Sequence, residues 1–116
     1  MSRPLAYVTS AWSITDYQAT RRNAIGYCRL LYEEGYSPIC PLLLQDSFID
    51  DYDAKEHKDS MDMAEELLRR SRVVVVCGPY VDDKLRSDIA LAKRLGIVTT
   101  TLNGILEAGE EVIECD

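Results

Sequence analysis

The sequence has few of the features that mark membrane, metal or polynucleotide-binding proteins. It contains no apolar stretch near the roughly 20 residues that a membrane helix needs. It has one histidine and four cysteines, which form no CxxC or Cys/His metal pattern. The net charge is −7, which disfavours a DNA or RNA polymer because binding one requires clustered Lys and Arg. We therefore expect no membrane, no nucleic-acid polymer, no metal and no cofactor.

A single small nucleotide stays possible despite the acidic charge, because backbone N–H groups at a helix start can hold its phosphates. The first residues, "MSRPLAYVTS", lack the apolar h-region of a signal peptide, so we expect a cytoplasmic protein. The cysteines at 28, 40, 77 and 115 are far apart in the chain. Three of them sit in apolar segments, where a free cysteine behaves as a small hydrophobe. We expect reduced, structural thiols.

Common signatures of nucleotide and hydrolase sites are also missing. The chain has no GxGxxG, GxxxxGK[ST], GxSxG or HExxH. His57 lies in a charged segment, which favours a solvated residue over a catalytic base. The carboxylates at Asp46, Asp50, Asp51 and Asp53 lack the glycine and terminal glutamate of a calcium loop. They indicate a solvated acidic loop.

What the sequence does contain is a regular alternation of short β-type and longer helical runs. Its 116 residues suit one domain, 1–116. The alternation predicts an α/β fold, a flavodoxin-like or Rossmann-like three-layer sandwich with four or five mainly parallel strands. Strands are expected at 5–9, 37–42, 73–77 and 97–102, and helices at 17–34, 60–71 and 83–95.

Local signals refine these elements. Two prolines, Pro38 and Pro41, place the second strand at a sheet edge, because proline cannot donate to a central ladder. Asp16 is expected to cap the first helix and Gly35 to end it. The helix at 60–71 is expected to turn Met61 inward, together with Ala64 and Leu68. Segment 44–59 is expected to be irregular, and the tail "EEVIEC" to add a short fifth strand.

Ligands of parallel α/β sheets bind outside the carboxyl ends of the strands. This rule selects the loops 10–16, 41–53 and 78–83. Asp82 and Asp83 stand where a helix cap belongs, and Asp88 lies near the positive end of the same helix dipole. Capping and dipole alone would explain all three carboxylates, and Tyr7 is equally explicable as a core residue.

Several segments in order resemble one family. They are "AYVTSAWS", Asn23-Ala24 with Tyr27, "GYSPICPLLL", "FIDD", "MDMAEELL", "VVVCGPY" and "IALAKRLGI". This series resembles the small bacterial and phage domains related to the nucleoside 2-deoxyribosyltransferases. The resemblance covers nearly the whole chain up to about Leu102. It implies a nucleoside-shaped pocket and a homo-oligomer in which a neighbouring subunit closes that pocket.

The resemblance also implies roles for particular residues. Tyr7 matches a first-strand tyrosine that assists a glutamate nucleophile. Asp82 matches the first position of the nucleophile motif, and Asp88 stands where the glutamate is expected. Lys84 replaces the glycine of that motif and Leu85 replaces its Thr or Met. In the family reaction a carboxylate attacks the sugar C1′, and an acceptor base or water resolves the covalent intermediate.

These replacements argue against an intact transferase. Aspartate is one methylene shorter than glutamate, and a displacement of about 1 Å can cost about 10²-fold in rate. Lys84 removes a glycine that lets a ligand approach the backbone, although its cation could hold a phosphate. We therefore expect a nucleotide-binding domain without family-type turnover, which would sequester a nucleotide-derived ligand in a phage-encoded member.

Two alternatives stay open. One is an active N-glycosidic enzyme, a deoxyribosyltransferase or nucleotide N-glycosidase, with Asp88 as nucleophile and Tyr7 and Asp82 in support. The other is a protein-interaction domain without a small ligand. Trp12 and Tyr80 could stack on a base or serve as loop anchors. The expected ligand-binding residues are Ser10, Trp12, Gly78, Tyr80, Asp83 and Lys84.

Overall fold

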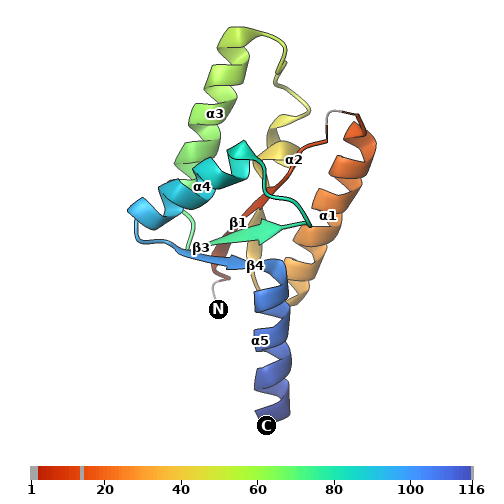
Figure 1. The fold of residues 1–116 in the computed structure, drawn as a ribbon, viewed down its shortest axis with the longest axis vertical. Coiled ribbons are helices and arrows are strands. Elements are labelled where there is room, and N and C mark those ends of the chain that lie inside the picture. Colours follow the sequence, from red (N-terminus) through yellow and green to blue (C-terminus); the bar gives the residue numbers. More distant parts are fainter. Residues whose placement is uncertain (1–2, 14, 116) are drawn as a thin grey trace.

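The computed structural model describes residues 3–13 and 15–115, with side chains described as far as residue 108. Its four strands form one parallel sheet in the order β2-β1-β3-β4 (Figure 1). The α/β fold with a parallel sheet predicted from the alternating pattern is thus confirmed. The elements are β1 (Leu5–Ser10), α1 (Tyr17–Glu33), β2 (Ser37–Ile39), α2 (Pro41–Gln45), α3 (Ala54–Arg69), β3 (Val73–Cys77), α4 (Asp83–Arg94), β4 (Val98–Thr101) and α5 (Leu102–Cys115).

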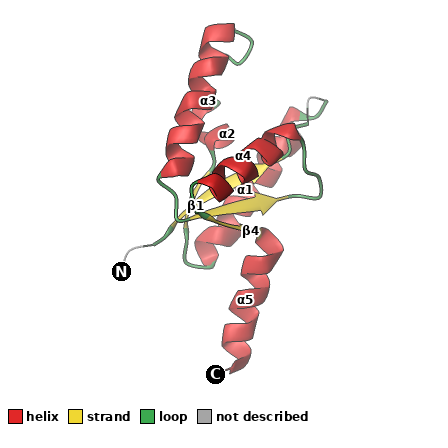
Figure 2. Ribbon diagram, turned by 60° about the vertical axis from the view of Figure 1, so that its left-hand side comes forward, coloured by secondary structure: helices red, strands yellow, loops and turns green. Residues whose placement is uncertain are grey.

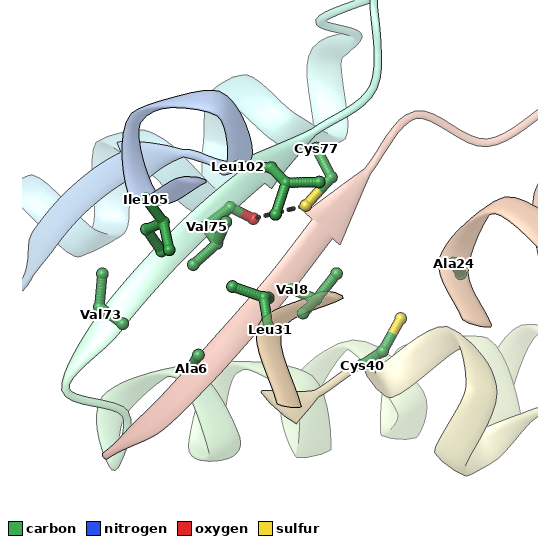
Figure 3. Packing of buried hydrophobic residues seen from close by; sticks show 10 residues of the cluster. All are labelled: Ala6, Val8, Ala24, Leu31, Cys40, Val73, Val75, Cys77, Leu102 and Ile105. Atoms are coloured by element: carbon green, nitrogen blue, oxygen red, sulfur yellow. Dashed lines mark hydrogen bonds between the residues drawn. The ribbon is translucent and has the colours of Figure 1, made fainter. Parts of the chain in front are cut away.

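The sheet is the middle layer of three. Successive side chains of a strand point to opposite faces, so β1 serves two cores. Ala6 and Val8 join a cluster with residues of α1 and α5, whereas Tyr7 joins a cluster with residues of α3 and α4. Figure 2 shows α4 in front of the strands and α1 behind them. The first cluster, drawn in Figure 3, consists of Ala6, Val8, Ala24, Leu31, Cys40, Val73, Val75, Cys77, Leu102 and Ile105.

Several predicted boundaries are confirmed. Strand β2 pairs with β1 and stands at the sheet edge, as its prolines predicted. The side chain of Asp16 accepts a hydrogen bond from the Ala19 N–H at 2.9 Å and caps α1. Gly35 follows α1 with φ of 95°, a left-handed conformation that favours glycine and stops the helix.

The segment between β2 and β3 is more helical than predicted. Pro41 starts helix α2, since its fixed φ suits the first helical position, so β2 ends earlier than expected. Helix α3 begins at Ala54 because the Asp53 side chain accepts hydrogen bonds from two N–H groups of its first turn. The prediction for Met61 was wrong: it is 57% exposed, while Ala64 and Leu68 face the core.

The tail is a helix, which corrects the predicted fifth strand. Leu102 and Ile105 are buried and Leu106 packs against the same cluster, a spacing that suits one helix face. The Thr101 hydroxyl accepts a hydrogen bond from the Gly104 N–H at 3.0 Å at the helix start. Figure 1 shows α5 leaving the sheet and projecting from the body of the domain, whose longest extent is 52 Å.

Candidate functional site

A cavity of about 200 Å³ lies where β1 and β3 end. Ser10 and Cys77, the last residues of these strands, are register partners, and both line the cavity. The carboxyl ends of parallel strands are where α/β sheets bind ligands, so the cavity stands where the loop argument placed it. It is lined by Ser10, Ala11, Trp12, Ser13, Asp16, Ala19, Thr20, Asn23, Tyr27, Cys77, Gly78, Pro79 and Tyr80.

One wall of the cavity is formed by α1 and the residue that caps it. Asp16, Ala19, Asn23 and Tyr27 recur at helical spacing and so share one face of the helix. Thr20 ties this wall to the β1–α1 loop: its hydroxyl accepts from the Ser13 N–H and donates to the Asp16 carbonyl, both at 3.1 Å. The loop that carries Trp12 is therefore held against the helix rather than free in solvent.

Aromatic side chains border the cavity from three segments. Trp12 is 38% exposed and its ring centroid lies 5.4 Å from that of Tyr17, in a tilted arrangement. Tyr80, on the loop after β3, is largely exposed. Tyr27 approaches from α1, and its hydroxyl would lie 3.2 Å from a Cβ placed at Gly78. Flat apolar faces with polar tips around a small opening suit a planar, polar-edged ligand.

Asp82 connects the two loops of the site. One carboxylate oxygen accepts from the Leu85 N–H at 2.9 Å and caps α4, as its position in the sequence predicted. The other oxygen accepts from the Trp12 N–H at 3.3 Å, across the sheet end. Because its two carboxylate oxygens bind the start of α4 and the Trp12 N–H at the same time, Asp82 positions Trp12.

Substitution of Asp82 by alanine should remove both contacts at once. We expect a loss of about 0.5–2 kcal/mol in the free energy of unfolding, the usual cost of a lost helix cap. Asp53→Ala is the matched control, since Asp53 caps α3 away from the cavity. Both variants should melt earlier, but only Asp82→Ala should change the emission of Trp12, the single tryptophan. Unchanged emission in Asp82→Ala would contradict the positioning role.

A second group of polar residues lies on the α4 side of the sheet. The buried Thr9 hydroxyl donates to Oδ2 of Asp88 at 2.8 Å, and Lys84 Nζ lies 3.6 Å from the same oxygen. The Asp88 side chain is 17% exposed. Tyr7 is buried beside it, and burial, followed by the Asp88 charge, raises the pKa of the Tyr7 hydroxyl well above its usual range. Tyr7 therefore stays a proton donor at neutral pH.

The fold sorts the predicted site residues into groups. Ser10, Trp12, Gly78 and Tyr80 line the cavity. Tyr7, Asp88 and Lys84 belong to the group on the α4 side. Asp83 is exposed and pairs with Arg86 at 3.0 Å. The sequence-based list omitted the α1 wall, although polar residues at helical spacing directly after the first loop could have indicated it. The wall residues are Asp16, Ala19, Thr20, Asn23 and Tyr27.

The described part of the chain has no helix with the length and apolarity needed to cross a bilayer. Among the side chains that the structure describes, no group of three or more His, Cys, Asp or Glu is arranged to hold a metal ion.

Comparison with known proteins leaves the activity open. A search of the curated proteins finds no match to this chain. The likeness to the deoxyribosyltransferases therefore stays a prediction from the sequence. A comparison with protein families matches residues 4–102, from the residue before β1 to the start of α5. The matched segment contains the whole cavity and every predicted site residue. The chain therefore belongs to the family described as Domain of unknown function (DUF7768).

Proposed function

We propose that this domain binds a nucleoside or nucleotide in the cavity at the ends of β1 and β3, without family-type turnover. The observation that carries the proposal is the aromatic border of Trp12, Tyr27 and Tyr80 around an opening at the carboxyl end of a parallel sheet. The volume of about 200 Å³ is below the roughly 300–1,000 Å³ of sites for drug-sized ligands. It suits a nucleobase whose sugar points to solvent.

The charges near the cavity favour the base over the phosphate as the buried part. Among the described residues that line the cavity, Asp16 is the one that carries a charge, and it is negative. The start of α4 is an unfavourable phosphate site, because Asp82 already accepts the Leu85 N–H and Asp83 adds a further negative charge. The Lys84 ammonium group already forms an ion pair with Asp88, at 3.6 Å. Any phosphate is therefore expected to extend away from the protein.

The placement of Asp88 supports binding without turnover. A nucleophile has to approach the reacting carbon to about 3–3.5 Å. Asp88 is not one of the described residues that line the cavity, and its Oδ2 is held by Thr9 and Lys84. The shorter aspartate side chain reduces its reach further. If the base of a nucleoside binds in the cavity, Asp88 is therefore not placed to attack the sugar of that nucleoside.

A second candidate function is an N-glycosidic enzyme, and the pairing of Tyr7 with Asp88 favours it. The Asp88 charge acts on the buried Tyr7 hydroxyl and helps to raise its pKa. The resemblance to the deoxyribosyltransferases places a tyrosine and a nucleophilic carboxylate at these two positions. In this alternative the sugar would enter from the α4 side, and Asp88 would attack C1′ with Tyr7 as a supporting donor.

Titration of ligands into the protein, followed by the fluorescence of its single tryptophan, tests the proposal directly. Nucleosides, deoxynucleoside monophosphates, NAD-derived nucleotides and cyclic oligonucleotides should be added separately while Trp12 emission and the melting temperature are recorded. We expect at least one ligand to quench Trp12 and to stabilise the protein by about 2.7 kcal/mol at 100 times its Kd. Chromatography after incubation should recover that ligand intact.

Three variants separate the alternatives. Trp12→Ala should weaken binding by about 1–3 kcal/mol in calorimetry, the usual contribution of a base stacked on an aromatic ring. Tyr52→Ala, which removes a fully exposed aromatic side chain outside the cavity lining, should bind like the parent. Asp88→Asn should also bind like the parent. Release of free base that disappears in Asp88→Asn would establish the enzyme instead, and no response to any ligand would favour the protein-interaction domain.

The homo-oligomer implied by the resemblance stays a prediction. Light scattering of the free protein and of the protein with the best ligand of the titration series would test it.

A further inference from the structure

The two edges of the sheet differ in how they are protected against pairing with another strand. At one edge, β2 is only three residues long and contains Pro38, a residue that edge strands use against further pairing. At the other edge, β4 consists of one valine and three threonines, β-branched residues that favour strands. It contains no proline and no charged residue. The edge at β4 therefore lacks the residues by which natural sheets keep an exposed edge unpaired.

The backbone of β4 is open on its outer side. Among the described residues, β3 is the one strand that pairs with β4. Because a strand can bond along both of its edges, β4 presents N–H and C=O groups on the side away from β3. Helix α5 begins directly after β4, and Figure 1 shows it leaving the end of the strand and extending beyond the sheet. These outward groups are therefore available to another strand.

The sheet face beside this edge is only partly covered. Val98 is the register partner of Val73, so both side chains point to the face that carries α1 and α5. Val73 is buried there, whereas Val98 is 65% exposed. The start of α5 lies over Thr100, since a Cβ placed at Gly104 would be 2.8 Å from the Thr100 hydroxyl oxygen. Thus α5 covers the end of β4 and leaves an apolar side chain exposed at its start.

Charge favours a second copy of this chain as the partner of the edge. The segment from Leu95 to Leu106 is uncharged, so two copies can meet along it although each has a net charge of −7. The exposed cations Lys93 and Arg94 precede β4, and the exposed Glu107 follows it. Antiparallel pairing brings the start of one β4 to the end of the other, and with them these unlike charges. Parallel pairing would bring like charges together.

We propose that the chain forms a two-fold dimer in which β4 of one copy pairs antiparallel with β4 of the other, joining the two sheets into one. A two-fold axis perpendicular to the sheet keeps α5 of both copies on the same face. The α5 that follows the end of one β4 then lies beside the start of the other, where Val98 is exposed. The same pairing thus satisfies the open backbone groups of β4 and covers Val98 with a helix of the second copy.

This interface is separate from the proposed ligand site. The described residues that line the cavity include none from β4 or α5. We therefore expect the dimer to form without ligand, and its test does not depend on nucleotide binding.

Sedimentation velocity of the full chain, without ligand and with a reductant that prevents disulfides between molecules, tests the proposal. Over a concentration series the mass should rise from that of one chain to twice that value, with a dissociation constant on the order of micromolar. Hydrogen exchange at both ends of the series locates the contact. Amides of β4 should exchange at least tenfold more slowly in the dimer, and those of β2 should not change. A chain that stays monomeric, or a dimer without protection of β4, would overturn the proposal.

A matched pair of variants makes the assignment specific. Val98→Glu places a carboxylate at the edge and should weaken the dimer at least tenfold. Ile25→Glu makes a similar aliphatic-to-carboxylate change at a side chain that is 49% exposed, on α1, which packs against β1 and β2. It should dimerise like the parent, although its net charge equals that of Val98→Glu. A thermal melt checks that both variants fold. Equal dimerisation of the two variants would contradict pairing through β4.

Glu107→Lys tests the orientation of the two strands. The change makes the chain less negative, which by itself favours association. In the antiparallel dimer, however, the new cation approaches Lys93 and Arg94 of the second copy, so the dimer should be weakened severalfold. Because Glu107 is exposed, the fold should be unaffected. A dimer that is unchanged or tighter in Glu107→Lys would exclude the antiparallel arrangement.

Discussion

Replacing Leu85 by alanine should lower the free energy of unfolding by about 2–5 kcal/mol, the usual cost of removing a fully buried leucine side chain. Leu85 is 0% exposed and lies in the first turn of α4, the helix that packs on α3, β1 and β3. The cavity left behind would loosen the helix that carries the Asp82 cap and Asp88. Urea denaturation followed by circular dichroism would measure the loss.

The matched control is Leu44→Ala, which makes the same chemical change at a side chain that is 53% exposed. Its effect should stay within about 0.5 kcal/mol, as for ordinary surface substitutions. Equal losses in the two variants would contradict the packing of α4 against the sheet, because burial is the property in which the two leucines differ.

Gly78→Ala should destabilise the domain by about 1–2 kcal/mol and also obstruct the cavity. Gly78 has φ of 93°, where a side chain meets the backbone, and a left-handed conformation costs other residues about 1–2 kcal/mol. The added Cβ would lie 3.2 Å from the Tyr27 hydroxyl, so Tyr27 would have to move within the cavity wall. Under the proposed function the affinity for the ligand should fall at least tenfold.

Gly96→Ala separates these two effects. Gly96 also has a positive φ, 72°, but a Cβ there meets nothing within 4 Å. Gly96 lies after α4, at the opposite end of that helix from the cavity. We expect a similar loss of stability in both variants, measured by denaturation, and a loss of ligand affinity in Gly78→Ala alone. Equal affinity in both would show that the Gly78–Tyr27 contact does not shape the site.

Much of the fold was predictable because its signals are local. The apolar run from Val73 to Cys77 indicated a strand with both faces covered, and β3 is such a strand in the middle of the sheet. Asp16 and Asp82 each cap the helix that follows them. Such a cap was predictable because it requires only an N–H group a few residues later in the chain. Pro38 marked the edge strand for the same kind of reason, the missing N–H.

The errors concern segments whose structure depends on distant partners. The tail is helical because Leu102 and Ile105 find a core made by α1, β1 and β3, which a short window of sequence does not contain. The early start of α3 was missed because the acidic segment before His57 has a polar composition typical of loops. The Asp53 cap, with its two N–H partners, overrides that composition.

The sequence predicted where the candidate site lies, but not which of its residues share the cavity. The rule on strand ends selected the loops of Ser10 and Gly78, and both line the cavity. The sequence named Asp88 as a possible nucleophile and Trp12 as a ligand-binding residue, but it did not indicate how the two lie relative to one another. The alternation of β1 turns Thr9, and with it Asp88, to the α4 side, while Ser10 faces the side of α1.

The sequence by itself determined the α/β alternation, the helix caps, the edge position of β2 and the loops around the site, because these follow from interactions within a few residues. Only the tertiary structure decided which side chains share a space. Packing α1 and α4 on opposite faces separated the cavity from Asp88. The same packing gathered Cys28, Cys40 and Cys77 at one core cluster, since contacts between elements depend on how helices lie on the sheet, which no spacing along the chain records.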